Sequence, residues 1–267
     1  MLTSAFDCVA PSFDKYRRLP SGVPEAVRLA VFDATKIASS RPRLLDIGCG
    51  TGRIGWPFVV AGDDYVGVDL SAGMLHEFVQ RGATRDGGRP RLVMADGRQL
   101  PFADAVFDLV LLIQVFGGLG DWRRLGTEAR RVLRLSGSLI LGRIAPPADG
   151  IDARMKRRLD SILETLGAEL DKTNTRSDVE RTFAAEATTA SRVVGATWTC
   201  ERTPRGFIER HRSGARFSAL PAPITEGALR ELASWAAATF GSLDATFTES
   251  NLCELQIFKF QNAMDQP

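Results

Sequence analysis

The chain has 267 residues, 44% of them hydrophobic and 25% charged, which fits a folded globular protein and argues against a disordered or fibrous one. Its 34 basic and 32 acidic residues give a net charge of only +2, so nucleic-acid binding is not favoured. The four scattered cysteines show no CxxC spacing and follow no secretory leader, and no apolar run is long enough to cross a bilayer. We therefore expect a cytoplasmic protein without a membrane partner, and with only two histidines we expect no metal site.

The first forty residues combine an aromatic, charged opening with an apolar-periodic stretch. The opening runs from Phe13 to Arg18, and the periodic stretch runs from Val27 to Ile37. This pattern predicts a flexible arm followed by a helix. We expect residues 1–40 to form a lid.

Short apolar runs alternate with amphipathic segments over residues 41–145. Such alternation is typical of a parallel sheet covered by helices on both faces. We predict an α/β core with a doubly wound, mostly parallel Rossmann-like sheet. Strands are expected at 44–47, 65–68, 92–94, 107–113 and 138–141, and helices at 53–60, 73–80 and 122–133.

The alternation stops after Leu141. An arginine-rich helical stretch covers 153–167, and another helix is expected from Glu226 to Phe240. Strand character returns at 192–200 and 252–260. We expect residues 146–267 to form a helical cap or insertion together with the last two strands of the sheet.

A glycine-rich turn follows the first strand of the core. Gly48, Gly50 and Gly52 alternate with Cys49 and Thr51, and a residue without a Cβ lets the backbone turn sharply and approach a ligand closely. Asp69 ends the second strand about 20 residues further on, where a carboxylate commonly meets a ribose. The two features predict an adenosine-type ligand.

The charge next to the turn distinguishes between adenosine-type ligands. Asp46 stands where the pyrophosphate of a dinucleotide would lie, so a dinucleotide would be repelled. S-adenosylmethionine (SAM) carries an ammonium and a sulfonium, which a carboxylate attracts directly or through water. Arg53 also occupies the place of the last glycine in the dinucleotide motif GxGxxG. We therefore predict SAM, and a nicotinamide-dependent dehydrogenase is the less favoured alternative.

A third acidic residue follows the third strand. Asp96 could accept the adenine amino hydrogens, and Gly97 would let the ring lie close. Taken alone, each of the three acids could also be a solvated turn residue or a helix N-cap.

Four segments, Leu45–Gly52, Val66–Met74, Asp96–Leu112 and Arg131–Leu141, resemble successive motifs of class I SAM-dependent methyltransferases. Within that family the chain is similar to the branch of quinone C-methyltransferases and natural-product methyltransferases that act on small molecules. The resemblance implies contacts to the methionine end of SAM from Asp46, Gly48 and Gly50, with Cys49 in the same cofactor-binding loop. It also implies a ribose contact from Asp69, adenine packing by Leu70 and Met74, and an adenine-edge contact from Asp96 beside Gly97. Gln114 would face the methionine portion and the acceptor.

The sequence departs from that family's pattern in places. Pro57 falls inside the helix expected after the glycine loop and should kink or shorten it. Leu135-Ser136-Gly137 stands where Pro-Gly-Gly is common, and Phe116-Gly117-Gly118 replaces a histidine-rich run. The last change leaves the catalytic base unknown.

Methyl transfer needs a base only if the acceptor atom must lose a proton. The weak candidates are Tyr16 and His211, with a solvated surface residue as the alternative for His211. Tyr16 and Arg17 resemble a Tyr-Arg arm that packs on SAM and contacts its carboxylate, with a disordered tail as the alternative. The arginines of the cap could recognise an acidic substrate or could line a solvated face, and we favour the solvated face.

The expected function is SAM-dependent methyl transfer to an oxygen, nitrogen or carbon atom of a small molecule, mainly by proximity and orientation. The alternatives are an RNA or protein methyltransferase and a catalytically silent SAM-binding protein. A small acceptor predicts an enclosed pocket, whereas a macromolecular acceptor predicts a contiguous platform.

Overall fold

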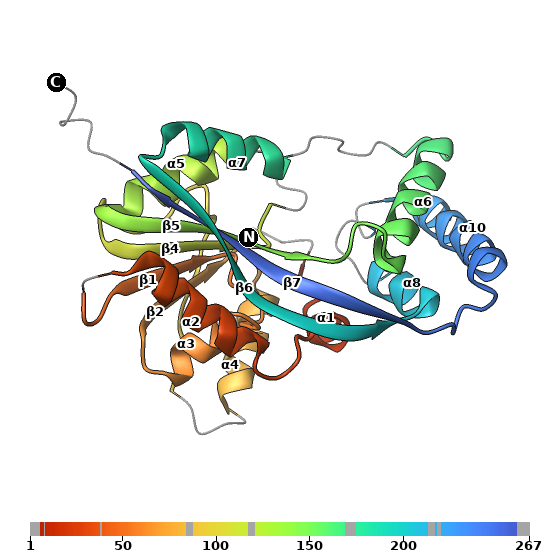
Figure 1. The fold of residues 1–267 in the computed structure, drawn as a ribbon, viewed down its shortest axis with the longest axis horizontal. Coiled ribbons are helices and arrows are strands. Elements are labelled where there is room, and N and C mark those ends of the chain that lie inside the picture. Colours follow the sequence, from red (N-terminus) through yellow and green to blue (C-terminus); the bar gives the residue numbers. More distant parts are fainter. Residues whose placement is uncertain are drawn as a thin grey trace.

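The protein folds around one open sheet of seven strands (Figure 1). The computed structural model describes residues 6–7, 9–37, 39–83, 88–116, 121–168, 175–212, 217 and 220–260. The strand order is β3-β2-β1-β4-β5-β7-β6; β1 to β5 run parallel, and β7 lies antiparallel between β5 and β6. The strands are β1 (Arg43–Ile47), β2 (Asp64–Asp69), β3 (Arg91–Met94), β4 (Phe107–Ile113), β5 (Leu133–Ala145), β6 (Thr189–Arg202) and β7 (Phe247–Lys259).

Helices cover both faces of this sheet (Figure 1). One buried cluster joins α2, α3 and α4 to one face, and another joins α5 and α7 to the other face. The arrangement confirms the predicted doubly wound fold. These helices are α2 (Val23–Thr35), α3 (Trp56–Val60), α4 (Ala72–Ala83), α5 (Trp122–Val132) and α7 (Thr175–Glu186).

Three further helices form a separate apolar cluster at one end of the sheet (Figure 1). They are α6 (Ile151–Thr165), α8 (Pro204–Arg212) and α10 (Ala222–Phe240). Helix α6 follows the carboxyl end of β5, α8 follows the carboxyl end of β6, and α10 precedes the start of β7. We refer to α6, α8 and α10 as the cap.

The segment that was expected to be a flexible arm contains helix α1 (Ala10–Arg17). Pro11 lies in its first turn, where the missing N–H is not needed for an intrahelical bond. Val9 and Ala10 are buried with Met74 of α4, so tertiary contact stabilises this short helix. The prediction of a flexible arm was wrong for this part of the chain.

The structure also corrects the helix predicted over 53–60. The chain makes turns up to Gly55, and α3 begins at Trp56, so that Pro57 stands in its first turn. Proline is favoured there because its φ is already helical and its N–H would be unpaired in any case. Pro57 therefore starts the helix rather than kinking it.

Candidate functional site

A cavity of about 390 Å³ lies at the carboxyl ends of the parallel strands. Its walls come from the residues that end β1 and β2, from the turn after β3 and from the turn after β4. The strand order reverses between β1 and β4, and ligands of open α/β sheets bind at such a switch point. After the ligand predicted from the sequence, we call this cavity the SAM pocket. It is lined by Phe6, Phe13, Ile47, Gly48, Gly50, Val68, Asp69, Leu70, Met74, Ala95, Asp96, Gly97, Arg98, Gln114, Val115 and Leu125.

The glycine loop forms one wall of the SAM pocket. Gly48, Gly50 and Gly52 all have positive φ values, of 75°, 55° and 74°. A Cβ on Gly52 would lie 2.3 Å from the ring of Phe78, whereas a Cβ on Gly50 would meet nothing within 4 Å. Gly50 therefore faces open space, which leaves its backbone accessible to a ligand.

Asp69 holds the glycine loop from the end of β2. Its Oδ2 accepts a hydrogen bond from the amide of Gly50 at 2.9 Å, and its Oδ1 accepts one from the amide of Ser71 at 2.9 Å. Burial raises the pKa of this carboxyl, while the backbone donors act to lower it. The Leu70 amide also acts on this carboxylate, and a carboxylate offers about four lone-pair sites, so Asp69 keeps acceptor capacity for a neighbouring hydroxyl.

Asp96 and Gly97 lie where the sequence predicted them, on the wall after β3. The Asp96 carboxylate accepts bonds from Nε and a terminal nitrogen of Arg98, at 3.0 and 2.7 Å, and these bonds lower its pKa. A Cβ on Gly97 would lie 2.8 Å from Ile47, so only glycine fits there. Arg98 also lines the pocket, and the sequence analysis missed it.

Two of the predicted cofactor-binding residues, Asp46 and Cys49, are absent from the pocket wall. Asp46 is only 3% exposed, and its Oδ2 accepts a hydrogen bond from the hydroxyl of Tyr65 at 2.7 Å. Burial, reinforced by the neighbouring Asp69 and opposed by the Tyr65 bond, raises the pKa of Asp46 to about 7. Cys49 is buried, and burial together with the two acids raises its pKa. Both side chains lie behind the glycine loop.

Leu70, Met74 and Gln114 all line the pocket, as predicted. Gln114 has φ 61°, a left-handed backbone conformation that is uncommon for a residue other than glycine. The backbone N–H of Gln114 donates a hydrogen bond to the carbonyl of Gly142 on β5 at 3.0 Å. Strained backbone of this kind concentrates at functional sites, which agrees with a role for Gln114 at the end of β4.

The N-terminal segment contributes two aromatic side chains, Phe6 and Phe13, to the pocket wall. Asp7 fixes this segment, since its Oδ1 accepts bonds from the Ser71 hydroxyl at 2.6 Å and the Gly73 amide at 3.1 Å. Neither aromatic residue was singled out from the sequence. The available signal was the presence of two phenylalanines near Val9 and Ala10 in this segment.

Tyr16 and Arg17, the predicted lid residues, do not line the pocket. The Arg17 guanidinium lies 4.9 Å from the centre of the Phe13 ring and donates to the carbonyl of Arg210 on α8 at 3.3 Å. Burial, followed by the charge of Arg210, lowers the pKa of Arg17. Arg17 thus connects a pocket residue to the cap.

His211, the other candidate base, lies on α8 of the cap and not at the pocket. Its ring stacks on Phe207 with centroids 3.8 Å apart, and Nδ1 lies 2.9 Å from the Phe207 carbonyl. A carbonyl only accepts, so Nδ1 carries the proton of the neutral ring. Burial lowers the pKa of His211 to about 4. His211 is thus half-buried, with one face of its ring packed on Phe207.

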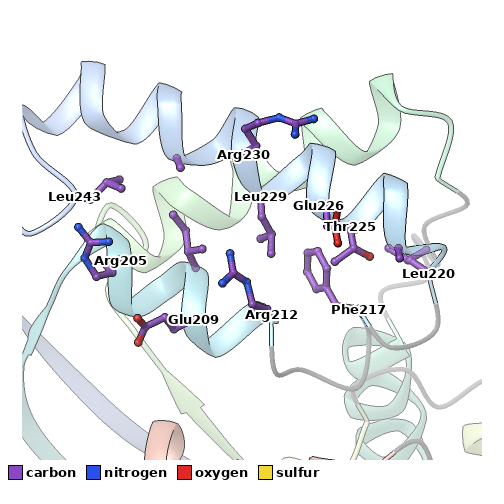
Figure 2. A pocket seen from close by; sticks show the side chains of 13 residues that line it. Arg205, Glu209, Arg212, Phe217, Leu220, Thr225, Glu226, Leu229, Arg230 and Leu243 are labelled. Carbon is purple, nitrogen blue, oxygen red and sulfur yellow. The ribbon is translucent and has the colours of Figure 1, made fainter.

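A second, larger cavity of about 780 Å³ lies between α8 and α10 (Figure 2). Its wall combines apolar side chains such as Phe217 and Leu229 with charged ones such as Arg212 and Glu226. The lining residues of α8 are Arg205, Ile208, Glu209 and Arg212, which recur at helical spacing. None of the residues of this cavity lines the SAM pocket.

Most cap arginines within the described ranges have partners on the protein. Arg158 pairs with Glu231, Arg205 with Asp244, and Arg210 with Asp152. Arg154 lies over the ring of Phe240 at 4.7 Å. Arg210 departs from the predicted solvated face, because its side chain is only 15% exposed. Arg216 lies outside the described residues, as do Gly117 and Gly118 of the departure after β4.

Two absences hold for the residues that the structure describes. No group of three or more histidine, cysteine, aspartate or glutamate side chains is placed to hold a metal ion. No helix in the described ranges combines the length and apolar character needed to cross a membrane.

Known proteins resemble this chain in sequence and in fold. The demethylmenaquinone methyltransferase of Renibacterium salmoninarum is 31% identical over 150 residues, which are 56% of this chain and 61% of that protein. The corresponding protein of Parafrankia sp. is 27% identical over 236 residues, 79% of this chain and 92% of its own. The crystal structure of the YcgJ protein of Bacillus subtilis superposes with a TM-score of 0.57 at 19% identity, covering 89% of this chain and 99% of that chain.

These matches differ in extent. The chain spans about 60% of the length of several curated relatives that it matches, including the Renibacterium protein. Residues 45–141 match the family model described as a methyltransferase domain. That range includes the glycine loop, Asp69, Asp96 and Gln114, and it coincides with the strands that build the SAM pocket. Over these residues, and in its doubly wound sheet, the chain is similar to known methyltransferases.

Proposed function

We propose that the protein is an enzyme that transfers a methyl group from SAM to an oxygen, nitrogen or carbon atom of a small-molecule acceptor. The observation that carries the proposal is the 390 Å³ pocket at the switch point of the sheet, with a glycine loop and two carboxylates at its edge. Its volume is in the range of small-molecule sites. Curated relatives include proteins named as demethylmenaquinone methyltransferases, which supports a small acceptor.

The pocket residues fit SAM by their chemistry. Gly50 faces open space and could lie against the methionine portion, and the free lone pairs of Asp69 suit the ribose hydroxyls. Asp96 could accept the adenine amino hydrogens while it keeps its bond to Arg98. Leu70 and Met74 offer apolar surface for the ring. Asp46 would act on the bound cations from behind the loop, with Cys49 beside it.

When bound, SAM supplies an electrophilic methyl group. The chain's part is to hold the acceptor atom in line with it, because such alignment supplies much of the catalysis of methyl transfer. Gln114 lines the pocket at the end of β4 and would face both reactants. The segment 1–40 would act as a lid over the core of residues 41–145, and residues 146–267 would supply the cap that encloses the acceptor. Tyr16 and His211 lie off the pocket wall, so neither is assigned as the base.

The cytoplasm remains our proposed location. Cys49, Cys200 and Cys253 are free thiols in the structure, which suits a reducing compartment.

The proposed function is tested in two steps. Calorimetry should show SAM binding at micromolar affinity and no binding of NAD, and the reverse result would replace the methyltransferase by a dehydrogenase. Incubation with methyl-labelled SAM and a metabolite extract, followed by mass spectrometry, should then identify a labelled small molecule. Label found only on protein or RNA would point to a macromolecular acceptor.

A further inference from the structure

One polar contact lies behind the SAM pocket and has no place in the proposed chemistry. The hydroxyl of Tyr65, on β2, donates to Oδ2 of Asp46, on β1, at 2.7 Å. Tyr65 is 2% exposed and Asp46 is 3% exposed, so water does not compete for this bond. The two residues lie on neighbouring parallel strands.

The fold makes room for the Tyr65 hydroxyl. It lies over Gly55, where a Cβ would come within 2.1 Å of the hydroxyl oxygen. The ring itself is fixed by stacking on Phe58 at 5.9 Å and by an edge contact with Phe78 at 6.1 Å. The hydroxyl therefore has one position, and that position places a donor at the Asp46 carboxylate.

The surroundings of Asp46 favour its neutral form. Burial has the largest effect, and the carboxylate of Asp69 adds repulsion, so the pKa of Asp46 is about 7 although the Tyr65 bond lowers it. Cys49 is the third titratable group here, and its pKa is raised as well. Asp46 is therefore protonated in about half of the molecules near neutral pH.

Bound SAM would favour the ionised form of Asp46 over the neutral form. Its ammonium and sulfonium would bind on the far side of the glycine loop, and a nearby positive charge favours the ionised form of a carboxyl. We propose that Tyr65 is a positioning residue for SAM, which holds the Asp46 side chain behind the glycine loop and links SAM binding to the release, into solvent, of the proton carried by the neutral form of Asp46. This inference rests on the proposed function.

The direction in which SAM affinity changes with pH follows from the form of Asp46 that SAM prefers. Because SAM prefers the ionised carboxylate, its affinity should rise with pH and level off above about pH 7. Tyr65→Phe keeps the ring but removes the donor, so the ionised form becomes harder to reach. We expect the midpoint of the affinity profile to move upward by about one pH unit. SAM should then bind about fivefold more weakly than to wild type at pH 7, but within about twofold at pH 8.5.

The experiment is calorimetric titration of the full-length protein with SAM between pH 6 and 8.5, in pairs of buffers that differ in ionisation enthalpy. At pH 7, Tyr65→Phe should release about 0.4 proton more per SAM than wild type, and Asp46→Asn about 0.5 proton fewer. The amino group of SAM titrates in a nearby range, but its contribution is the same for every variant.

Two further variants control for packing. Gly55→Ala should displace the Tyr65 hydroxyl and reproduce the shifted profile. Thr35→Val removes another buried hydroxyl, one that donates to Val31 at 2.8 Å, and should leave the profile unchanged.

The outcomes separate the two proposals. A loss of affinity in Tyr65→Phe that is equal at all pH values would reduce Tyr65 to a structural role, and an unchanged proton count in Asp46→Asn would remove the link to Asp46. If wild type binds no SAM at any pH, the proposed function itself fails.

Discussion

The ring of Phe13 on α1 and the side chain of Met74 on α4 pack together in a small apolar cluster that also lines the SAM pocket. This contact joins the N-terminal segment to the core domain. The two arginines that lie over Phe13, Arg17 at 4.9 Å and Arg53 at 5.6 Å, add cation–π contacts on the same ring. Phe13 is therefore one of the two aromatic residues through which the N-terminal segment contributes to the pocket wall.

Replacing Phe13 by Ala should weaken SAM binding, because an apolar wall of the pocket is lost. Partial burial of an aromatic side chain contributes about 1–2 kcal/mol, so the Kd for SAM should rise about 5- to 30-fold. Calorimetry measures the effect. Lys15→Ala, an exposed residue on the same helix, is the matched control and should bind SAM like wild type. Equal affinities for Phe13→Ala and Lys15→Ala would separate α1 from the site.

Asp69→Ala removes the proposed ribose acceptor and also the bonds to Gly50 and Ser71. Charge-assisted bonds are worth about 1.5–3 kcal/mol each, and water replaces part of them, so we expect a net loss of about 2–4 kcal/mol. The affinity for SAM should fall about 30- to 1,000-fold. Asp69→Asn, which keeps one acceptor, should lie between wild type and Ala. A folded Asp69→Ala protein that binds SAM within about threefold of wild type would disprove the ribose assignment.

The strands and the pocket residues could be predicted because local patterns determine them. Each core strand is a short apolar run, and parallel strands bring their carboxyl ends to one edge, so Asp69 and Asp96 necessarily approach each other. The bond between Arg98 and Asp96 could also have been predicted from the sequence, since the two residues are only two positions apart.

Other features depend on contacts between distant segments and were missed. Helix α7 buries only Val179 and Phe183, two positions one turn apart, which is too little for a periodic pattern. The burial of Asp46 depends on Tyr65 from the next strand, so a residue expected at the ligand lies behind the loop. The half-buried position of His211 depends on Phe207 and Phe217, whereas its charged neighbours in the sequence suggested a solvated helix.

Gly50→Ala should mainly impair SAM binding and Gly52→Ala should mainly lower stability, although both glycines belong to one loop. Gly52 has φ 74° and a Cβ there would lie 2.3 Å from Phe78, so Ala should cost about 2–4 kcal/mol of unfolding free energy. Gly50 has φ 55° and open space, so Ala should cost about 1 kcal/mol but place a methyl group where SAM would bind. Thermal melting and SAM titration test the pair. Equal stability of the two variants would show that the Phe78 contact relaxes without cost.

His211 should make the protein less stable in mild acid. Its pKa is about 4 in the folded state and about 6.5 in an unfolded chain, so between these values only the unfolded state binds the proton. Stability from this group is complete above about pH 6.5 and falls by about 2 kcal/mol between pH 7 and pH 5. His211→Asn keeps a donor for the Phe207 carbonyl but does not titrate, so its free energy of unfolding should lack this fall. Urea unfolding at the two pH values measures the difference, and other titrating groups, including Asp46, cancel between variant and wild type. His76→Asn, at an exposed histidine, should behave like wild type; parallel pH dependence of all three proteins would show that His211 is protonated without unfolding.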